Sequence, residues 1–245
     1  MPDTRTESAA APAVGTGAYE PTGRTVPTRS RERAVYDREQ VHSILDGAYL
    51  CHLGFVRDGA PVVLPTLYAR VGERVYVHGS TGSRPLRMAS GADGEAPGLP
   101  VCLTVTHLDG LVLARSAFHH SVNYRSVVIH GTAHQVVDPG ERRAALDALV
   151  DAVAPGRSRD SRPPNARELA ATAVLRLDLE EVSAKVRTGP PVDDPEDLDL
   201  PYWAGGRCPL PDPVWGSGSG GLSRPGGPGT RGFLPVGFLD ALGAG

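Results

Sequence analysis

The sequence of 245 residues lacks the features that mark several common classes of protein. It has no basic excess: the formal net charge is −3, which argues against a nucleic-acid-binding face and favours small-molecule partners. It has no continuous apolar run near the roughly 18 residues of a membrane span. It also has no apolar core of a secretory signal near its start. We therefore expect a cytoplasmic protein that binds neither nucleic acid nor membrane.

Cysteine and lysine are scarce. Cys51, Cys102 and Cys208 are far apart and form no C-x-x-C pair, so neither a disulfide framework nor a zinc knuckle is predicted. Cys51 and Cys102 lie in apolar runs and are expected to be core thiols. Lys185 is the single lysine among 25 basic residues. Its presence suggests a role that arginine cannot fill, and an exposed cation on a solvent face is the alternative.

The common glycine-rich phosphate motifs, Walker A and the Rossmann fingerprint, are also missing. Residues 74–88 carry a different pattern, in which Val75 and Val77 alternate with Tyr76 and His78 and predict a half-buried strand. The strand runs into a turn of small, hydroxylated and basic residues: Gly79, Ser80, Thr81, Gly82, Ser83, Arg84 and Arg87. Free amides, hydroxyls and guanidinium groups in such a turn can hold a phosphate. A turn that binds only water is the alternative.

The folded part is predicted to be mainly β with short helices. Strand-like runs occur at residues 49–57, 61–70, 74–78, 101–107, 111–118, 122–137 and 175–187, the last bent near Glu181. Asp58-Gly59 predicts a tight hairpin, and a second hairpin is expected across Asp109-Gly110 after a flexible break at residues 90–98. Six or seven mainly antiparallel strands indicate a closed or partly closed β-barrel.

Three helices and two tails complete the expected organisation. Asp37 is expected to cap a first helix, Asp138 a second that ends at Pro155-Gly156, and Asn165 a third that reaches about residue 172. The apolar residues expected on the buried face of the second helix are Ala145, Leu146, Leu149, Val150 and Val153. Residues 1–30 are expected to be a disordered tail, residues 31–204 a single domain, and residues 205–245 a Gly/Pro-rich tail with a possible apolar contact at 233–242.

Four segments, by their order and spacing, resemble the flavin-binding split-barrel superfamily of pyridoxamine 5′-phosphate oxidases. The closer resemblance is to the branch that includes the nitroimidazole-resistance proteins. The segments are Pro65-Thr66 within residues 51–70, Tyr76-Val77-His78 followed by Gly82-Ser83-Arg84, Asn123-Tyr124-Arg125-Ser126-Val127 leading to Gly131, and residues 183–191 before Tyr202-Trp203. The resemblance implies a six-stranded antiparallel split β-barrel, usually a homodimer with FMN bound in clefts between subunits.

The resemblance also implies that the turn at residues 82–84 cradles the FMN phosphate. The cofactor-binding residues that it implies are Pro65, Thr66, Val77, His78, Gly79, Ser80, Ser83, Arg84, Arg125 and Ser126. The residues themselves add Arg87, a cation after the turn, and Lys185, the single lysine, as candidates for the same site. Pro85 follows Arg84 where the oxidases have a lysine, so one phosphate cation is missing unless Arg87 replaces it. Ser126 stands where the oxidases have a glutamine. Nothing matches the C-terminal Arg and His of the true oxidases, so oxidation of vitamin B6 is not expected.

Histidines are the candidates for proton transfer and for metal or haem binding. His78 stands where the related branch has a histidine beside the flavin ring, which makes it the candidate catalytic proton donor. A half-exposed polar residue at a strand end is the alternative. The pairs His119-His120 and His130 with His134 offer too few ligands for a metal site, and none is predicted. Haem bound through one of them stays open, because some split-barrel relatives bind haem.

Three functions follow from this pattern. The first is an FMN-dependent oxidoreductase that reduces or oxidises a small organic molecule. The second is a flavin- or haem-binding module without turnover, acting as a carrier or sensor. The third is a reductase that uses a deazaflavin on the same fold.

Overall fold

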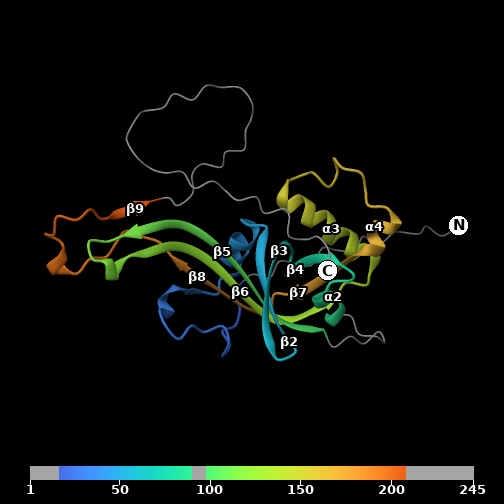
Figure 1. Cartoon of the computed structure of the whole chain (residues 1–245), viewed down its shortest axis with the longest axis horizontal. Helices are drawn as coiled ribbons and strands as arrows, with labels where there is room; N and C mark the ends of the chain where they lie inside the picture. The colour runs from blue at the N-terminus through green and yellow to red at the C-terminus, as the bar shows by residue number, and fades with distance from the viewer. Residues whose placement is uncertain (1–16, 90–97, 208–245) are drawn as a thin grey trace, which may run out of the picture. The chain divides into compact units, whose positions relative to one another are not determined.

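The computed structural model describes residues 17–89 and 98–207 (Figure 1). Six of its strands pair into a closed ring. Each strand pairs with its neighbours in the cyclic order β6-β7-β4-β3-β2-β5-β6, and every pairing is antiparallel. The six strands are β2 Leu50–Arg57, β3 Ala60–Val71, β4 Arg74–Ser80, β5 Leu99–Leu113, β6 Ser121–Gln135 and β7 Thr172–Asp178. The predicted mainly β split barrel is confirmed.

The first predicted hairpin is confirmed. β2 pairs along its whole length with the first part of β3, from Leu50 opposite Leu67 to Arg57 opposite Ala60. Asp58 and Gly59 connect them with φ values of 51° and 77°. Two residues with positive φ make the tight turn whose twist matches that of the flanking strands.

The second predicted hairpin is wrong. Asp109 and Gly110 interrupt no strand: β5 continues through them with a register irregularity between Leu108 and Gly110. Neither residue has the positive φ that a two-residue hairpin turn requires. The chain reverses later, through the short helix η2 (Ala117–His119), so β5 and β6 form one long ribbon. The predicted flexible break falls largely on residues 90–97, which lie outside the described residues.

Three further strands extend the ring. The predicted last strand is two strands, β7 and β8 (Glu181–Arg187): β7 pairs with β4, while β8 leaves it to pair with β6. β1 (Ala34–Val35) adds to β8, and β9 (Gly205–Arg207) adds to β5. β9 lies within the predicted C-terminal tail, so the predicted domain boundary at residue 204 is wrong. The rest of that tail, residues 208–245, lies outside the described residues.

The three predicted helices are present, and each begins at its predicted cap. They are α1 Arg38–Asp46, α3 Pro139–Val153 and α4 Ala166–Ala171, whose caps Asp37, Asp138 and Asn165 accept a hydrogen bond from the backbone three residues on. A fourth helix, α2 (Arg84–Ala89), follows β4, and two 3-10 turns, η1 (Arg31–Arg33) and η3 (Pro195–Asp197), lie outside the barrel strands. None of the helices in the described part of the chain is long and apolar enough to cross a membrane.

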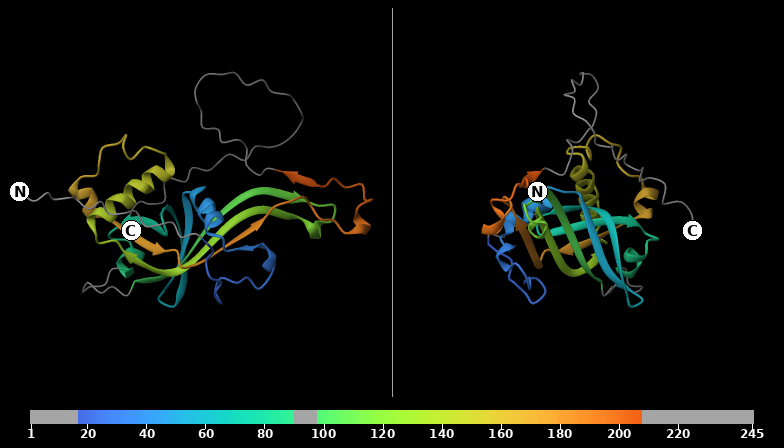
Figure 2. Two further views of the ribbon diagram at one scale, coloured as in Figure 1. Left: turned by 180° about the vertical axis from the view of Figure 1, so that it is seen from behind. Right: turned by 60° about the vertical axis from the view of Figure 1, so that its left-hand side comes forward.

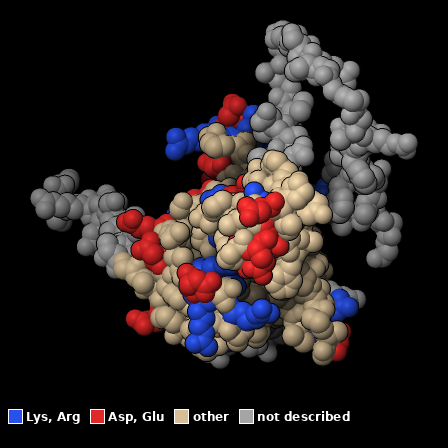
Figure 3. All heavy atoms as spheres, turned by 90° about the vertical axis from the view of Figure 1, so that its left-hand side faces the viewer, with Lys and Arg blue, Asp and Glu red and all other residues tan. Residues whose placement is uncertain are grey.

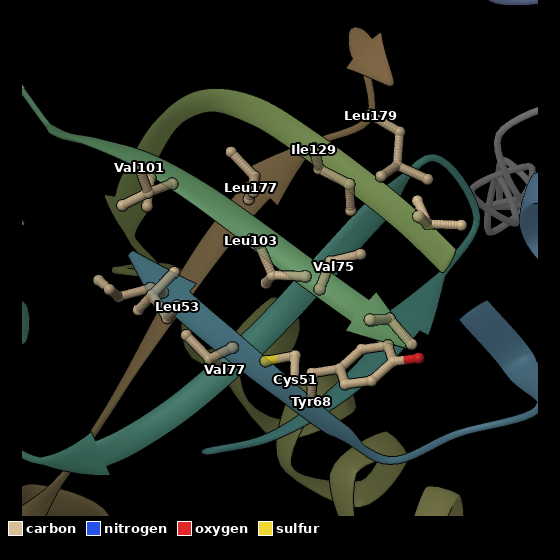
Figure 4. Close-up of a cluster of buried hydrophobic side chains, with 14 of the residues drawn as sticks. Cys51, Leu53, Tyr68, Val75, Val77, Val101, Leu103, Ile129, Leu177 and Leu179 are labelled. Atoms are coloured by element: carbon tan, nitrogen blue, oxygen red, sulfur yellow. The ribbon is translucent and has the colours of Figure 1, made fainter. Parts of the chain in front are cut away.

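The inner face of the ring holds the core. Alternate strand residues point inward, among them Cys51, Leu53, Val75, Val77, Leu103 and Ile129 (Figure 4). Burial raises the pKa of the Cys51 thiol to about 12, so Cys51 is the expected core thiol. Because strand side chains alternate, the residues between these point outward. The outer face of β3 and β4 is the surface that α3 covers.

The predicted disorder of residues 1–30 is wrong for the part that the structure describes. Residues 18–30 form a segment, here called the N-terminal strap, that pairs at Ala18 with Asp37 and buries Tyr19 and Thr25. The Tyr19 hydroxyl donates to Glu73 Oε2 at 3.0 Å, and Arg24 pairs with Glu181. The sequence shows no periodicity here because one aromatic residue and a few polar contacts, rather than a regular face, hold the strap. Residues 1–16 lie outside the described residues.

Candidate cofactor site

A cavity of about 540 Å³ lies between the outer face of the barrel and the α3–α4 pair. Leu67 of β3 and His78 of β4 line it from the sheet. The apolar residues that line it from the helices are Leu146, Leu149, Val150, Val153 and Leu169. Figure 2 shows α3, α4 and their connecting segment on one side of the strands. The volume lies within the range of small-molecule sites, which are concave and mostly apolar.

The way α3 is held leaves this cavity open. The Tyr76 hydroxyl donates to Glu141 Oε1 at 2.8 Å, and Tyr76 packs with Ala145 and Val174, which fixes the first half of α3 on the sheet. The second half is less covered: Val150 is 40% exposed and Val153 49% exposed. The prediction that both belong to a buried face is therefore wrong, because they line the cavity instead.

His78 is the polar group that the sheet presents to the cavity. It sits on the outer face of β4, opposite Val174 of β7. Its Nδ1 atom is buried and has no hydrogen-bond partner among the described residues. Burial lowers the pKa of His78, so the imidazole is neutral at neutral pH.

Charged residues surround the mouth of the cavity. Three arginines line it, each paired with an acid: Arg143 with Asp147 at 2.9 Å, Arg157 with Asp160 at 2.9 Å, and Arg162 with Glu168 at 2.7 Å. The hydrogen bond from Arg162 lowers the pKa of Glu168. These pairs are largely exposed and therefore weak, so the guanidinium groups can turn to another anion.

The turn after β4 differs from the predicted phosphate cradle. Its backbone donors already have partners within the protein: Thr81 N–H donates to Ala171 O at 3.0 Å, Gly82 N–H to Ser80 Oγ at 3.2 Å, and Ser83 N–H to Ser80 O at 2.8 Å. The expectation that these amides are free is wrong, because the turn closes on itself and on α4. Ser80 and Thr81, which carry hydroxyl groups of the turn, remain exposed. Arg84 is the first residue of α2, and Arg87 is exposed on it.

The predicted residues of β3 and β4 divide between the two faces of the sheet. Val77 packs in the barrel core, so its side chain does not face the cavity. Thr66, two residues before the buried Tyr68, is on the same inner side. Gly79 is also on the inner side of its strand. A Cβ atom at this position would lie 2.7 Å from Leu86 Cδ1, which is too close. Pro65 is exposed on the outer face, and Ser80 is exposed at the end of β4.

The remaining predicted residues lie elsewhere in the chain. Ser126 and Lys185 face each other across β6 and β8 and line a separate cavity of about 200 Å³ beneath the strap. Lys185 Nζ donates to the carbonyl of Arg29 at 3.3 Å, and Ser126 Oγ donates to the Lys185 carbonyl. Arg125 makes a two-fold ion pair with Asp109. The structure thus does not bring these three residues to the cavity that contains His78.

Ion pairs also occupy the tip of the β5–β6 ribbon. Arg115 pairs with Asp193 and His119 with Asp194, both at 2.9 Å. Figure 3, seen from the side on which this ribbon projects, shows basic and acidic side chains next to one another. No group of three potential metal ligands occurs among the described residues.

The comparison with known proteins identifies the family. The family model described as pyridoxamine 5′-phosphate oxidase matches residues 37–186. No curated protein sequence gives a significant match.

Several solved structures are similar to this chain. The flavocytochrome Anf3 from Azotobacter vinelandii is 41% identical, with 80% of this chain and 92% of that chain covered and a TM-score of 0.69. An FAD and haem binding protein from Mycobacterium smegmatis is 37% identical, with 76% and 92% covered and a TM-score of 0.66. A protein from Bacteroides thetaiotaomicron assigned to 5-nitroimidazole antibiotic resistance shares the fold at 20% identity, with 62% and 86% covered and a TM-score of 0.51. The chain belongs to the pyridoxamine 5′-phosphate oxidase family of split-barrel proteins.

Proposed function

We propose that the protein is a redox protein that binds a flavin nucleotide together with haem and transfers electrons to or from a small organic molecule. The observation that supports it most directly is the 41% identity with a flavocytochrome over 80% of the chain. The second relative, described as binding FAD and haem, supports the same pair of cofactors. Bound flavin would supply hydride or one-electron chemistry, and haem one-electron chemistry.

The turn after β4 fits the phosphate end of a flavin nucleotide. Ser80 and Thr81 are exposed there, and α2 begins at Arg84 directly after the turn. Hydroxyl groups and arginines can hold a phosphate in charge-assisted hydrogen bonds without the backbone amides. Pro65 on the neighbouring strand offers an exposed apolar surface for the attached rings. His78 is not part of this set, because its side chain lies in the covered cavity.

A second copy of the chain is the partner that we propose. The outer face of the β2–β3 hairpin exposes apolar side chains, with Val56 and Val63 each 61% exposed. An exposed apolar sheet face of this kind favours association. Ser126 and Lys185 lie in a cavity apart from the β4 turn, so one chain alone does not bring the predicted flavin residues together. In a homodimer the two groups could come from different subunits.

An absorption spectrum of the purified full-length protein tests the proposed function. We expect a flavin absorbance together with a Soret band. Both are expected to respond to chemical reduction, and mass analysis of the extracted flavin distinguishes FMN, FAD and deazaflavin. A colourless protein that takes up neither cofactor on titration would contradict the proposal. A spectrum with flavin absorbance but no Soret band would support the flavin part of the proposal and contradict the haem part.

Arg84→Ala tests the phosphate position. Removal of a charged hydrogen-bond partner of a phosphate costs about 1.5–3 kcal/mol, so flavin should be lost on dilution or gel filtration. Arg57→Ala is the matched control, because Arg57 lies at the β2–β3 turn and its side chain pairs only weakly, at 3.5 Å, with the exposed Asp58. Equal flavin retention in the two variants would show that the turn does not hold the phosphate.

A further inference from the structure

We propose that the cavity between β4 and the α3–α4 pair is the haem site, and that an imidazole nitrogen of His78 binds the iron. The inference rests on the proposed function, since it assigns the haem of that function to one cavity and one ligand. It separates the two cofactors in space: the flavin phosphate at the turn after β4, and the haem under the helices.

The apolar residues that line the cavity favour an apolar ligand. Leu67 faces it from the sheet, and Leu146, Leu149 and Leu169 face it from the helices. The apolar stripe of α3 continues into Val150 and Val153, yet the protein itself leaves both of these partly uncovered. Apolar side chains held open around a space of about 540 Å³ gain free energy when an apolar ligand fills it.

His78 is suited to bind a metal in these surroundings. A buried ring nitrogen without a hydrogen-bond partner is costly in an apolar site, so a ligand that engages the imidazole offsets that cost. Neutral imidazole is the form that coordinates iron, and a proximal histidine is a common haem ligand.

A flavin ring matches this cavity less well. The pyrimidine edge of an isoalloxazine carries donors and acceptors that need hydrogen-bond partners when buried. From the sheet the cavity is lined by the apolar Leu67 and the polar His78 and Thr172, and its other polar lining residues lie on α3, α4 and the segment between them. A haem macrocycle has no such edge. Arg157 and Arg162 line the cavity, together with the acids Asp147 and Glu168, and offer partners for the two haem carboxylates.

The other histidines are worse placed. His42 Nε2 lies 2.9 Å from the Tyr19 hydroxyl, and His107 Nε2 contacts the Ile44 carbonyl at 2.8 Å. His120 Nδ1 accepts from Ala114 N–H at 3.0 Å. His130 and His134 line a smaller cavity together with charged residues, including Arg24, Asp178 and Glu181. Among the described histidines, His78 combines an open apolar cavity with an unpartnered buried nitrogen.

The test uses the full chain purified after expression with excess haem precursor. Absorption and electron paramagnetic resonance spectra are recorded for the wild type, for His78→Leu, which keeps the position apolar and filled, and for His134→Leu as the matched control. We expect His78→Leu to lose the wild-type Soret band and ligand signature, and His134→Leu to keep both. Circular dichroism and flavin content verify that each variant folds.

His78→Gly with added imidazole separates a ligand from a structural residue. A free imidazole can occupy the space of the deleted side chain, so we expect it to restore the wild-type haem spectrum in this variant. A structural role would not be restored in this way. A wild-type spectrum in His78→Leu would overturn the assignment of His78 while leaving the proposed function intact. Absence of haem from the wild type, even after titration with hemin, would defeat the haem part of the proposed function itself.

Arginine variants test the orientation of the haem. We expect Arg157→Ala and Arg162→Ala each to weaken hemin binding about tenfold, the effect of losing one charge-assisted hydrogen bond. Arg159→Ala is the control, because Arg159 lines a neighbouring cavity and not this one. Equal hemin affinity in all three variants would overturn the placement of the carboxylates at this rim.

Discussion

At the scale of single residues, a buried polar cluster joins three distant parts of the chain. Tyr19 of the strap, His42 of α1 and Glu73 of the β3–β4 turn meet, with His42 Nε2 3.2 Å from Glu73 Oε1. Arg38 stacks on the Tyr19 ring at 4.2 Å and pairs with Glu73. Tyr19 is buried, whereas the side chains of Arg38 and Glu73 are 25% and 30% exposed, and such a network is costly to break.

The first prediction concerns pH. Burial, and then the nearby Arg70, lower the pKa of His42 from its ordinary 6.5, and burial lowers that of His78. Below pH 6.5 the unfolded chain therefore binds more protons than the folded protein does, so stability falls as the pH falls through this range. We expect the melting temperature of the cofactor-free protein to drop between pH 7.5 and 5.5, and to drop less in His42→Gln and in His78→Leu. The same pH slope in all three proteins would contradict this.

At the scale of elements, the same kind of signal has two outcomes. Asp58-Gly59 makes a hairpin turn, whereas Asp109-Gly110 lies within β5. The dipeptide favours a turn locally, but β6 pairs with β5 on both sides of Asp109, and this pairing outweighs the local preference and leaves only a register irregularity. Arg125 of β6 then holds Asp109 by a two-fold ion pair.

The second prediction concerns the N-terminal strap. Tyr19 is 2% exposed, so its removal leaves a cavity beside α1 and takes one hydrogen-bond partner from Glu73 and one from His42. We expect Tyr19→Ala to lower the free energy of unfolding by about 3 kcal/mol in urea titrations, the cost of a large aromatic truncation. Tyr19→Phe removes only the hydroxyl and should cost about 1 kcal/mol. A chain beginning at residue 31 should be less stable than one beginning at residue 17. Equal stability would show that the strap is not part of the folded unit.

At the scale of the whole folded unit, the inner face of the six-stranded ring is filled by the hydrophobic core. Its outer face has one part that helices cover and one part that is exposed. The helices α3 and α4 lie over the outer face of β3, β4 and β7, while the outer face of the β2–β3 hairpin keeps exposed valines. The covered part contains the proposed haem cavity, and the uncovered part is the proposed contact with a second copy.

The third prediction tests that contact. Val63→Glu introduces a charge at the centre of the proposed interface, where burial would be costly without a partner. We expect it to shift the protein from dimer to monomer in light scattering, with the fold retained. Val192→Glu is the control, because Val192 is 72% exposed but lies outside the β2–β3 hairpin. A monomeric wild type, or a dimer unchanged by Val63→Glu, would contradict the proposed partner.

The sequence by itself determined the properties that depend on near neighbours in the chain. The alternation of Val75 and Val77 with Tyr76 and His78 marks β4, because a strand side chain points to one face or the other. The caps Asp37, Asp138 and Asn165 mark helix starts, because each side chain bonds a backbone amide three residues on. The family resemblance rests on such short segments as well.

Only the tertiary structure decided what each face meets. The sequence of α3 reveals which of its residues are apolar. It does not reveal that Tyr76 packs against the first half of the helix, whereas Val150 and Val153 line a cavity. The amides of Thr81 and Ser83 seem free in the sequence, yet their partners at Ala171 and Ser80 arise from folding. The reason is physical: periodicity reports that a side chain avoids water, whereas the identity of its neighbour depends on strands and helices that are distant in sequence.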